Sequence, residues 1–323
     1  MIFCRRQSTG NKDEESFNLN GEAVKVVSQA IYLGFHLTSN GRWSNHISKM
    51  ANRGKAAMAT LFRNSNLTGI GDLKMHKNVF NPKIRPILHY GGEVWDLEVA
   101  NSLETLQLQY YKRMLGLHAT THTLFIKGDL GLFSMIKHRQ IQLIKFWLKI
   151  LQCPSSRLIR AAYDELLTLG QKSSWPFHVK KLLDSTGLSY AWNGGDGPIS
   201  DHKVFLSEIQ LRLEDQEIQK WWNDLSQSES LSSYYKVKEN FSEELYFKLG
   251  IPKESLRSWM QVRANCLPLH SIWKNRCHPE MRYTCPICGD LDGLDHFLFR
   301  CRGLNEVKGS FLWVGGVSPF LEL

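Results

Sequence analysis

A chain of 323 residues in which 42% of the side chains are hydrophobic can bury one or two cores, which excludes a wholly disordered protein. Its formal net charge of +9 at pH 7 favours polyanionic partners. No apolar run is long enough to cross a bilayer and the first residues lack the apolar core of a signal peptide, so we expect a nuclear or cytoplasmic protein without a membrane partner.

The first forty residues predict a small β element. Residues 1–20 are polar and charged, whereas Ala23–Val27 and Ala30–Leu37 are rich in β-branched and aromatic side chains. A short polar break separates these two runs, and Asn40-Gly41 is a turn signal. We therefore expect two or three short antiparallel strands in this region.

The rest of the chain has the pattern of amphipathic helices, with apolar residues recurring every three or four positions. Ser44 can cap the first helix, and Pro82 and Pro86 can bend the second. Gly116 and Pro154 are stop signals for two later helices. The predicted helices cover residues 44–63, 72–88, 99–116, 133–151, 156–169, 176–184, 202–226 and 231–248. The fold class is therefore expected to be mainly α.

Three cysteines and one histidine near the C-terminus have the spacing C-x2-C-x7-H-x4-C. They are Cys285, Cys288, His296 and Cys301. In a reducing compartment, seven cysteines at irregular spacing favour metal ligands over disulfides. Two thiolates from a tight knuckle and a His–Cys pair from one helical turn can complete a tetrahedron around zinc, with no position left for a reactive water. We therefore expect one structural zinc ion, which supplies folding energy on the order of 10–16 kcal/mol.

Other interpretations of the cysteines are open. Cys285 and Cys288 can instead be free thiols, and His296 a surface residue. Cys277 and His278, just upstream, can compete as ligands, although an adjacent pair forms an awkward chelate. Cys266 and Cys153 lie in apolar helical segments and are expected in the core.

Basic residues are concentrated between Arg42 and Tyr90. This segment holds nine Lys and Arg residues and one acidic residue, Asp72, so it carries a formal charge of +8. On a folded face, such a segment attracts phosphate backbones and makes binding depend on salt. A solvated helix surface is the alternative. Because nearly all of the net charge lies in this one segment, we favour a nucleic-acid partner.

Six residues of this part of the chain are candidates for nucleic-acid contacts: Lys49, Arg53, Lys74, Lys77, Tyr32 and Trp43. The two basic pairs have spacings of four and three residues, which put the members of each pair on one helical face. Simple solvation of the four charges is the alternative. The two aromatic side chains can stack on bases or riboses, with core packing as the alternative.

Five short motifs follow one another along the chain. They are Tyr32-Leu33-Gly34-Phe35, the run from Arg85 to Trp95, the run from Leu103 to Leu117, Gly128-Asp129-Leu130-Gly131-Leu132, and the run from Gln261 to Leu269 that leads to the Cys-Cys-His-Cys knuckle. In this order they resemble the region after the palm in reverse transcriptases of LINE-type (non-LTR) retrotransposons, over about residues 20–303. In the fourth motif the family more often has Glu where this chain has Asp129.

The resemblance implies a role in holding nucleic acid. In the family, this region contributes the primer-grip turn, a helical thumb and a nucleic-acid-binding knuckle, so Tyr32–Phe35 would match the primer grip. The family's palm carries a Tyr/Phe-Ala-Asp-Asp box and an upstream Asp, which bind two metal ions for nucleotidyl transfer. This chain has no Asp-Asp pair. We therefore expect no catalytic residue and no independent polymerase activity, although a separate palm can associate with the chain.

The expected architecture is a helical thumb-like body with a small N-terminal antiparallel β element and a C-terminal zinc knuckle. The clearest break in the chain is Trp192–Pro198. The predicted ranges are 1–40 for the β element that resembles the end of a palm, 41–190 for the basic thumb-like domain, 191–275 for a second helical segment, 276–306 for the knuckle and 307–323 for a tail.

Three classes of function follow from these features. The first is a nucleic-acid-binding fragment of a retrotransposon reverse transcriptase, which holds RNA or an RNA–DNA hybrid with weak sequence selectivity. The second is a zinc-stapled helical scaffold or protein-interaction protein in which the charge is incidental. The third is an enzyme, either a polymerase with a separately supplied palm or a metal hydrolase. The closed ligand set counts against hydrolysis, and the missing carboxylates count against polymerisation.

Overall fold

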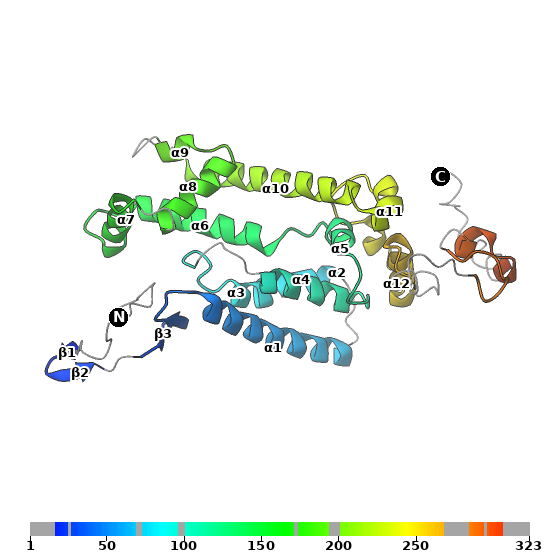
Figure 1. The fold of residues 1–323 in the computed structure, drawn as a ribbon, viewed down its shortest axis with the longest axis horizontal. Helices are drawn as coiled ribbons and strands as arrows, with labels where there is room; N and C mark the ends of the chain where they lie inside the picture. The colour runs from blue at the N-terminus through cyan, green and yellow to red at the C-terminus, as the bar shows by residue number, and fades with distance from the viewer. Residues whose placement is uncertain are drawn as a thin grey trace. The chain divides into compact units, whose positions relative to one another are not determined.

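The computed structural model describes residues 17–24, 27–68, 73–95, 101–170, 174–193, 201–267, 284–293 and 296–305. Helices dominate these residues, which confirms the predicted mainly α fold (Figure 1). The chain divides into two compact units. Unit 1 comprises Met1–Met114 and Phe133–Gln219, and unit 2 comprises Leu115–Leu132 and Lys220–Leu323. The five consecutive ranges expected from the sequence are a finer division and stay a prediction.

Two antiparallel β hairpins form the N-terminal β element, so the described residues contain four short strands where the sequence predicts two or three. They pair β1 (Phe17–Leu19) with β2 (Glu22–Val24), and β3 (Gln29–Tyr32) with β4 (Phe35–Thr38). The turn of the second hairpin consists of Leu33 and Gly34, whose φ angles are +47° and +83°. Positive φ at both positions is the type I′ geometry that suits the twist of a hairpin, but it is uncommon for a residue such as Leu33.

The first helical layer of unit 1 follows the hairpins. It consists of α1 (Ser44–Thr68), α2 (Leu73–Val79), the π-helical turn η1 (Phe80–Ile84), α3 (Arg85–Leu88) and α4 (Asn101–Met114). The predicted interruption of the second helix is confirmed, because Pro82, which lacks an N–H donor, lies in the π-helical turn. Gly54 lets α1 approach α3 closely, since a Cβ there would lie 2.3 Å from the Leu88 side chain.

The second helical layer of unit 1 surrounds its own apolar core. The helices are α6 (Met135–Leu151), α7 (Leu158–Thr168), α8 (Trp175–Ser185), α9 (Tyr190–Asn193) and α10 (His202–Ser226), whose last residues belong to unit 2. Trp147, Val179 and Ile209 are among the buried residues of this core. The indole N–H of Trp147 donates a hydrogen bond to the hydroxyl of Tyr163 at 3.0 Å. None of the described helices is both long and apolar enough to cross a membrane.

Unit 2 consists of shorter helices. They are α5 (Thr123–Leu130), the 3-10 turn η2 (Glu229–Leu231), α11 (Ser232–Val237), the 3-10 turn η3 (Leu245–Lys248), α12 (Lys253–Arg263) and, in the metal-binding motif, the π-helical turn η4 (His296–Arg300) and the 3-10 turn η5 (Arg302–Leu304). The predicted helix over residues 231–248 is wrong. It is broken between α11 and η3, because Lys238 adopts an extended conformation and its buried ammonium group pairs with Glu244.

A buried carboxylate, Asp129, connects the elements of unit 2. Asp129 is completely buried at the end of α5 and accepts hydrogen bonds from the hydroxyls of Tyr234 on α11 and Tyr246 on η3. The guanidinium of Arg263 on α12 donates to it at 3.1 Å, and the ammonium of Lys238 lies 3.9 Å away. With Glu244, which pairs with both cations, the network holds two positive and two negative charges. Asp129 therefore ties α5, α11, η3 and α12 together.

The glycines on either side of Asp129 allow this packing. A Cβ on Gly128 would lie 2.3 Å from the Trp221 ring and 2.6 Å from the Tyr234 hydroxyl oxygen. Gly131 has a φ of +56°, and a Cβ there would lie 2.9 Å from the backbone nitrogen of Glu243. The Gly128–Leu132 motif thus has a structural role within unit 2.

We expect Asp129→Asn to lower the free energy of unfolding by about 3–5 kcal/mol, because it removes one negative charge and leaves a buried cation uncompensated. Urea denaturation followed by tryptophan fluorescence measures this change. The exposed carboxylate Glu229 provides the control, and Glu229→Gln should change the free energy by no more than about 0.5 kcal/mol. Equal stability of the two variants would contradict the role assigned to Asp129.

Candidate functional site

The carbonyl oxygen of Tyr90 joins the second hairpin to the helices of unit 1. It accepts hydrogen bonds from Nε2 of His46 at 3.1 Å and from the indole N–H of Trp95 at 3.0 Å. Nδ1 of His46 accepts from the backbone N–H of His36 on β4 at 3.4 Å, which requires the His46 proton to lie on Nε2. Burial lowers the pKa of His46, and the ring is neutral at pH 7. His46 therefore fixes the start of α1 against both the hairpin and the turn after α3.

The turn after α3 also supports the hairpin through close packing. The Phe35 ring stacks on His46 with 5.3 Å between ring centroids. Gly91 has a φ of +70°, and a Cβ there would lie 2.2 Å from the Phe35 ring. The Tyr90 hydroxyl donates a hydrogen bond to the carbonyl of Leu33 at 2.6 Å, which holds the uncommon conformation of the hairpin turn. The hairpin thus packs on the Gly-rich motif after α3.

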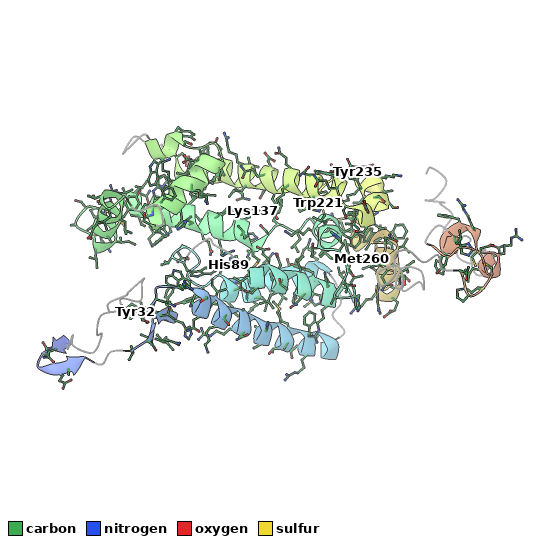
Figure 2. The ribbon with its side chains drawn as sticks, viewed as in Figure 1. Tyr32, His89, Lys137, Trp221, Tyr235 and Met260 are labelled. Carbon is green, nitrogen blue, oxygen red and sulfur yellow. The ribbon has the colours of Figure 1, made fainter. Side chains whose placement is uncertain are left out.

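The outer end of the hairpin is apolar and exposed. Ile31, Tyr32 and Leu33 are 69%, 65% and 72% exposed, and Figure 2 labels Tyr32. The predicted alternative of core packing therefore does not hold for Tyr32. It holds in part for Trp43, which is half-buried and contacts Phe35 edge-on at 6.1 Å between ring centroids. Stacking of Tyr32 or Trp43 on nucleic acid stays a prediction.

The exposed face of α1 is basic. Lys49 and Arg53 are both exposed and lie one helical turn apart, as the sequence predicts, and Lys55 and Arg63 are exposed on the same helix. The 25 residues of α1 contain no Asp or Glu. The opposite face carries apolar side chains into the core of unit 1, namely those of Met50, Met58 and Phe62. Lys49, Arg53 and Arg63 therefore project from one side of a packed helix, whereas Lys55, two residues after Arg53, projects from another side.

The second predicted basic pair lies on α2. Lys74 is exposed and Lys77 is half-buried, and both make contacts with other groups. His76, between them in sequence, is buried, and its Nδ1 lies 2.9 Å from the hydroxyl of Tyr110 on α4. Because His76 packs against Tyr110, the side of α2 that carries His76 faces the interior and the other sides face solvent. Phosphate contacts of Lys74 and Lys77 stay predictions.

The four residues of the predicted metal-binding motif form a cluster that could hold one metal ion. The ligand atoms of Cys285, Cys288, His296 and Cys301 all lie within 4.8 Å of one another. The sulfur of Cys301 is 3.8 Å from the sulfurs of both Cys285 and Cys288, and Cys288 Sγ is 3.1 Å from Nε2 of His296. A tetrahedral zinc ion with bonds of about 2.3 Å to sulfur places thiolates about 3.8 Å apart. The cluster thus has the donor set and spacing of a tetrahedral site.

Local backbone structure brings the four ligands together. The backbone N–H of Gly289, whose φ is +82°, donates to the carbonyl of Cys285 at 2.9 Å and closes the knuckle. His296 begins the π-helical turn η4, and the N–H of Cys301 donates to the carbonyl of His296 at 2.7 Å. A Cβ on Gly303 would lie 2.2 Å from the side chain of Ile287, so Gly303 lets the two halves of the motif approach.

The thiols of the cluster titrate differently. Backbone N–H groups of Ile287 and Cys288 lower the pKa of Cys285 to about 7, which favours the thiolate that binds metal. The backbone of Asp290 lowers the pKa of Cys288, but desolvation and the sulfurs of Cys301 and Cys285 raise it more, to about 11. A bound metal cation would stabilise the deprotonated form of each ligand, so metal binding would release the remaining protons of the thiols.

Cys153 and Cys266, the other cysteines among the described residues, do not belong to this cluster. Cys277 and His278 lie outside the described residues. Cys266 and Cys153 are half-buried, so the prediction that they are core residues holds only in part. The Cys153 thiol donates to the carbonyl of Lys149 at 3.3 Å.

Sequence reasoning missed the residues that position the hairpin. A single histidine on a helix, such as His46, gives no signal that it joins three segments. In the sequence, Tyr90 and Gly91 stand out only as part of the motif from Arg85 to Trp95.

In comparisons with known proteins, no family model, no curated protein and no solved structure matches this chain. The resemblance to LINE-type reverse transcriptases therefore stays a prediction.

We expect Gly91→Ala to lower the free energy of unfolding by several kcal/mol, on the order of 2–4, because the methyl group overlaps the Phe35 ring in addition to straining the backbone. Gly170→Ala is the matched control. Gly170 also has a positive φ, of +59°, but a Cβ there meets nothing within 4 Å, so only the backbone cost of about 1 kcal/mol applies. Urea denaturation compares the two variants, and equal losses would show that Phe35 does not pack tightly on Gly91.

We expect the purified protein to hold one divalent metal ion per chain, measured by inductively coupled plasma mass spectrometry. Cys285→Ser should reduce this content to near zero, because it removes a thiolate ligand. Cys153→Ser should leave it unchanged, since Cys153 is not in the cluster. Metal retained in full by the Cys285→Ser protein would place the ion elsewhere.

Proposed function

We propose that this chain binds nucleic acid through the basic face of α1 and the adjacent hairpin, and that its Cys3His cluster holds a structural zinc ion. The observation that carries the proposal is the exposed face of α1, which presents Lys49, Arg53 and Arg63 with no acidic residue along the helix. A rigid row of cations releases counterions from a phosphate backbone, which is the main source of weakly sequence-selective binding.

The hairpin adds a second kind of contact. Its exposed Tyr32 lies in the same unit as α1, and the bonds of His46 join the hairpin to the first turns of that helix. An exposed aromatic ring beside a basic face suits a flexible or single-stranded end, because bases stack on such rings whatever their sequence. RNA and RNA–DNA hybrids are the proposed ligands.

The donor set supports zinc as the metal. Three thiolates and one imidazole in a tetrahedral arrangement fit Zn²⁺, whereas Mg²⁺ and Ca²⁺ prefer oxygen ligands. All four coordination positions belong to the protein, so the role is structural. The motif also exposes Ile287, Leu291 and Phe299, which provide apolar surface for contact with bases.

The resemblance to the post-palm region of LINE-type reverse transcriptases supports the same proposal. The motif of Tyr32–Phe35 would take the role of the primer grip, and the helices of unit 1 that of the thumb. The sequence lacks the Asp-Asp pair of that family's palm. We therefore propose a nucleic-acid-holding chain without polymerase activity of its own, to which a separate palm can bind.

A zinc-stapled scaffold for protein partners is the second candidate. The observation that favours it is α7, where Leu158, Ile159 and Leu167 are 86%, 38% and 40% exposed, while Tyr163 is buried. Exposed aliphatic residues on one helix suit a protein partner better than a polyanion.

We expect Lys49→Ala/Arg53→Ala to weaken binding to a labelled RNA–DNA hybrid about tenfold and to reduce the slope of log affinity against log salt by about 2, since each lost phosphate contact removes close to one unit. Fluorescence anisotropy over a salt series measures both quantities. Lys145→Ala/Lys149→Ala is the matched control, because these exposed lysines have the same spacing on α6.

Two outcomes of this titration count against the proposal. If both double variants lose affinity equally, binding follows net charge and α1 has no special role. If the folded, metal-loaded protein does not bind at low salt, the scaffold is the better account. Removal of the metal should weaken binding further, because the knuckle then unfolds.

A further inference from the structure

The backbone groups of the second hairpin alternate between bonding across the hairpin and pointing outward from it. This alternation is general for antiparallel strands. The N–H of Ser39 donates to the carbonyl of Ser28 at 2.9 Å, so these two residues form a bonded pair. In the observed register, the backbone N–H and C=O groups of Gln29 and Ile31 on β3, and of His36 on β4, therefore point outward.

The two edges of this hairpin differ in what lies beside them. On β4, the outward N–H of His36 donates to Nδ1 of His46, so α1 covers this edge. On the other side, β4 is the one strand that pairs with β3 among the described residues. Within this part of the chain, no strand receives the outward backbone groups of Gln29 and Ile31. We call this side of β3, away from β4, the open edge.

The open edge is apolar and lacks common protections of edge strands. Charged side chains, proline and bulges keep edge strands from pairing with other chains. The sequence of β3 is Gln-Ala-Ile-Tyr, and its register with β4 is continuous. Ile31 and the following Leu33 are 69% and 72% exposed. Exposed apolar side chains thus lie next to backbone groups that have no strand partner among the described residues.

We propose that the open edge of β3 binds an extended apolar segment of a partner protein, which adds a third strand to the hairpin. An extended peptide presents N–H and C=O groups with the repeat of the strand itself, about 6.8 Å for every two residues. A nucleic-acid backbone instead presents anionic acceptors, and residues 29–33 contain no cation to attract them. Hydrogen-bond and charge complementarity at this edge therefore favour a polypeptide.

A second copy of this chain fits the edge less well than a short segment does. β3 has four residues and is about 14 Å long, whereas a stable dimer buries about 800 Å² of each partner. Transient complexes bury less surface. An interaction through this edge is therefore expected to be a weak one with an extended segment.

One end of the edge indicates the charge of the partner. Thr38 pairs with Gln29, and the Thr38 hydroxyl donates to the carbonyl of Arg42 at 2.9 Å, so Arg42 lies at the Gln29 end of the hairpin. Arg42 is exposed. We expect the partner segment to carry an acidic residue at this end, because opposite charges across an interface favour the correct register.

The open edge does not use the groups assigned to nucleic acid. Successive side chains of a strand point to opposite faces, so the ring of Tyr32 leaves the face that carries Ile31. Backbone groups of Gln29 and Ile31 bind the partner, whereas the proposed phosphate contacts lie on α1. The proposal therefore does not rest on the proposed nucleic-acid binding.

Selection from a phage-displayed library of linear peptides, with the full, metal-loaded chain as the target, tests the proposal. We expect enriched peptides with apolar residues at every second position and an acidic residue near one end. Fluorescence anisotropy measures their affinity. Ile31→Pro removes an outward N–H and no bond within the hairpin, and should weaken binding about tenfold. Ile31→Val keeps the N–H and an apolar side chain, so this matched control should bind as the unchanged chain does.

Two further measurements do not depend on how well the proline variant folds. Ile31→Lys keeps the backbone N–H but places a charge on the edge, and should also weaken binding. Amide hydrogen exchange measured by nuclear magnetic resonance follows the edge directly. The N–H groups of Gln29 and Ile31 should exchange rapidly in the free chain and become protected when a selected peptide is bound.

Four results would overturn the proposal. Slow exchange of both amides in the free chain would show that another segment of the chain already covers the edge. Peptides that bind the Ile31→Pro and Ile31→Lys proteins as tightly as the unchanged chain would place their site elsewhere. A selection that enriches no peptide would leave the edge without a polypeptide ligand. Protection of the two amides by an RNA–DNA hybrid, and not by a peptide, would assign the edge to nucleic acid.

Discussion

Every polar group that is removed from water needs a partner, and the packing of both units follows from this requirement. In unit 2, the buried carboxylate of Asp129 draws hydroxyl and cationic groups from three later helical elements into one network. In unit 1, the carbonyl of Tyr90 accepts hydrogen bonds from His46 and Trp95, and so joins the hairpin, α1 and the turn after α3. Apolar burial supplies most of the stability, but these polar centres decide which segments meet.

The metal-binding motif meets the same requirement by other means. Ten residues of knuckle and one turn of π-helix bury little apolar surface, and Ile287, Leu291 and Phe299 are more than half exposed. The four ligands converge on one point from two short segments, so a metal ion bound there would replace the missing core. Desolvation and then the neighbouring sulfurs raise the pKa of Cys288, and a metal ion bound there would overcome this barrier to deprotonation.

The sequence predicts the local features of this structure well and the long-range ones poorly. The helices α1, α4 and α6 and the Cys3His cluster follow from periodicity, caps and spacing, which are properties of neighbouring residues. The break between α11 and η3 could not be predicted, because it depends on the pairing of Lys238 with Glu244 around Asp129, more than a hundred residues away in sequence. For the same reason nothing in the sequence singled out His46, whose role exists only once distant segments have packed.

The position of His46 has a consequence for how charge is presented on unit 1. His46 lies in the first turn of α1, and the exposed cations begin one turn later at Lys49. Because burial keeps the His46 ring neutral, the anchor adds no charge of its own and its bonds persist at neutral pH. The hairpin turn and the start of the basic helix are therefore fixed to one carbonyl oxygen, that of Tyr90. A ligand that contacts both surfaces meets them already oriented, so binding need not include the entropic cost of ordering one against the other.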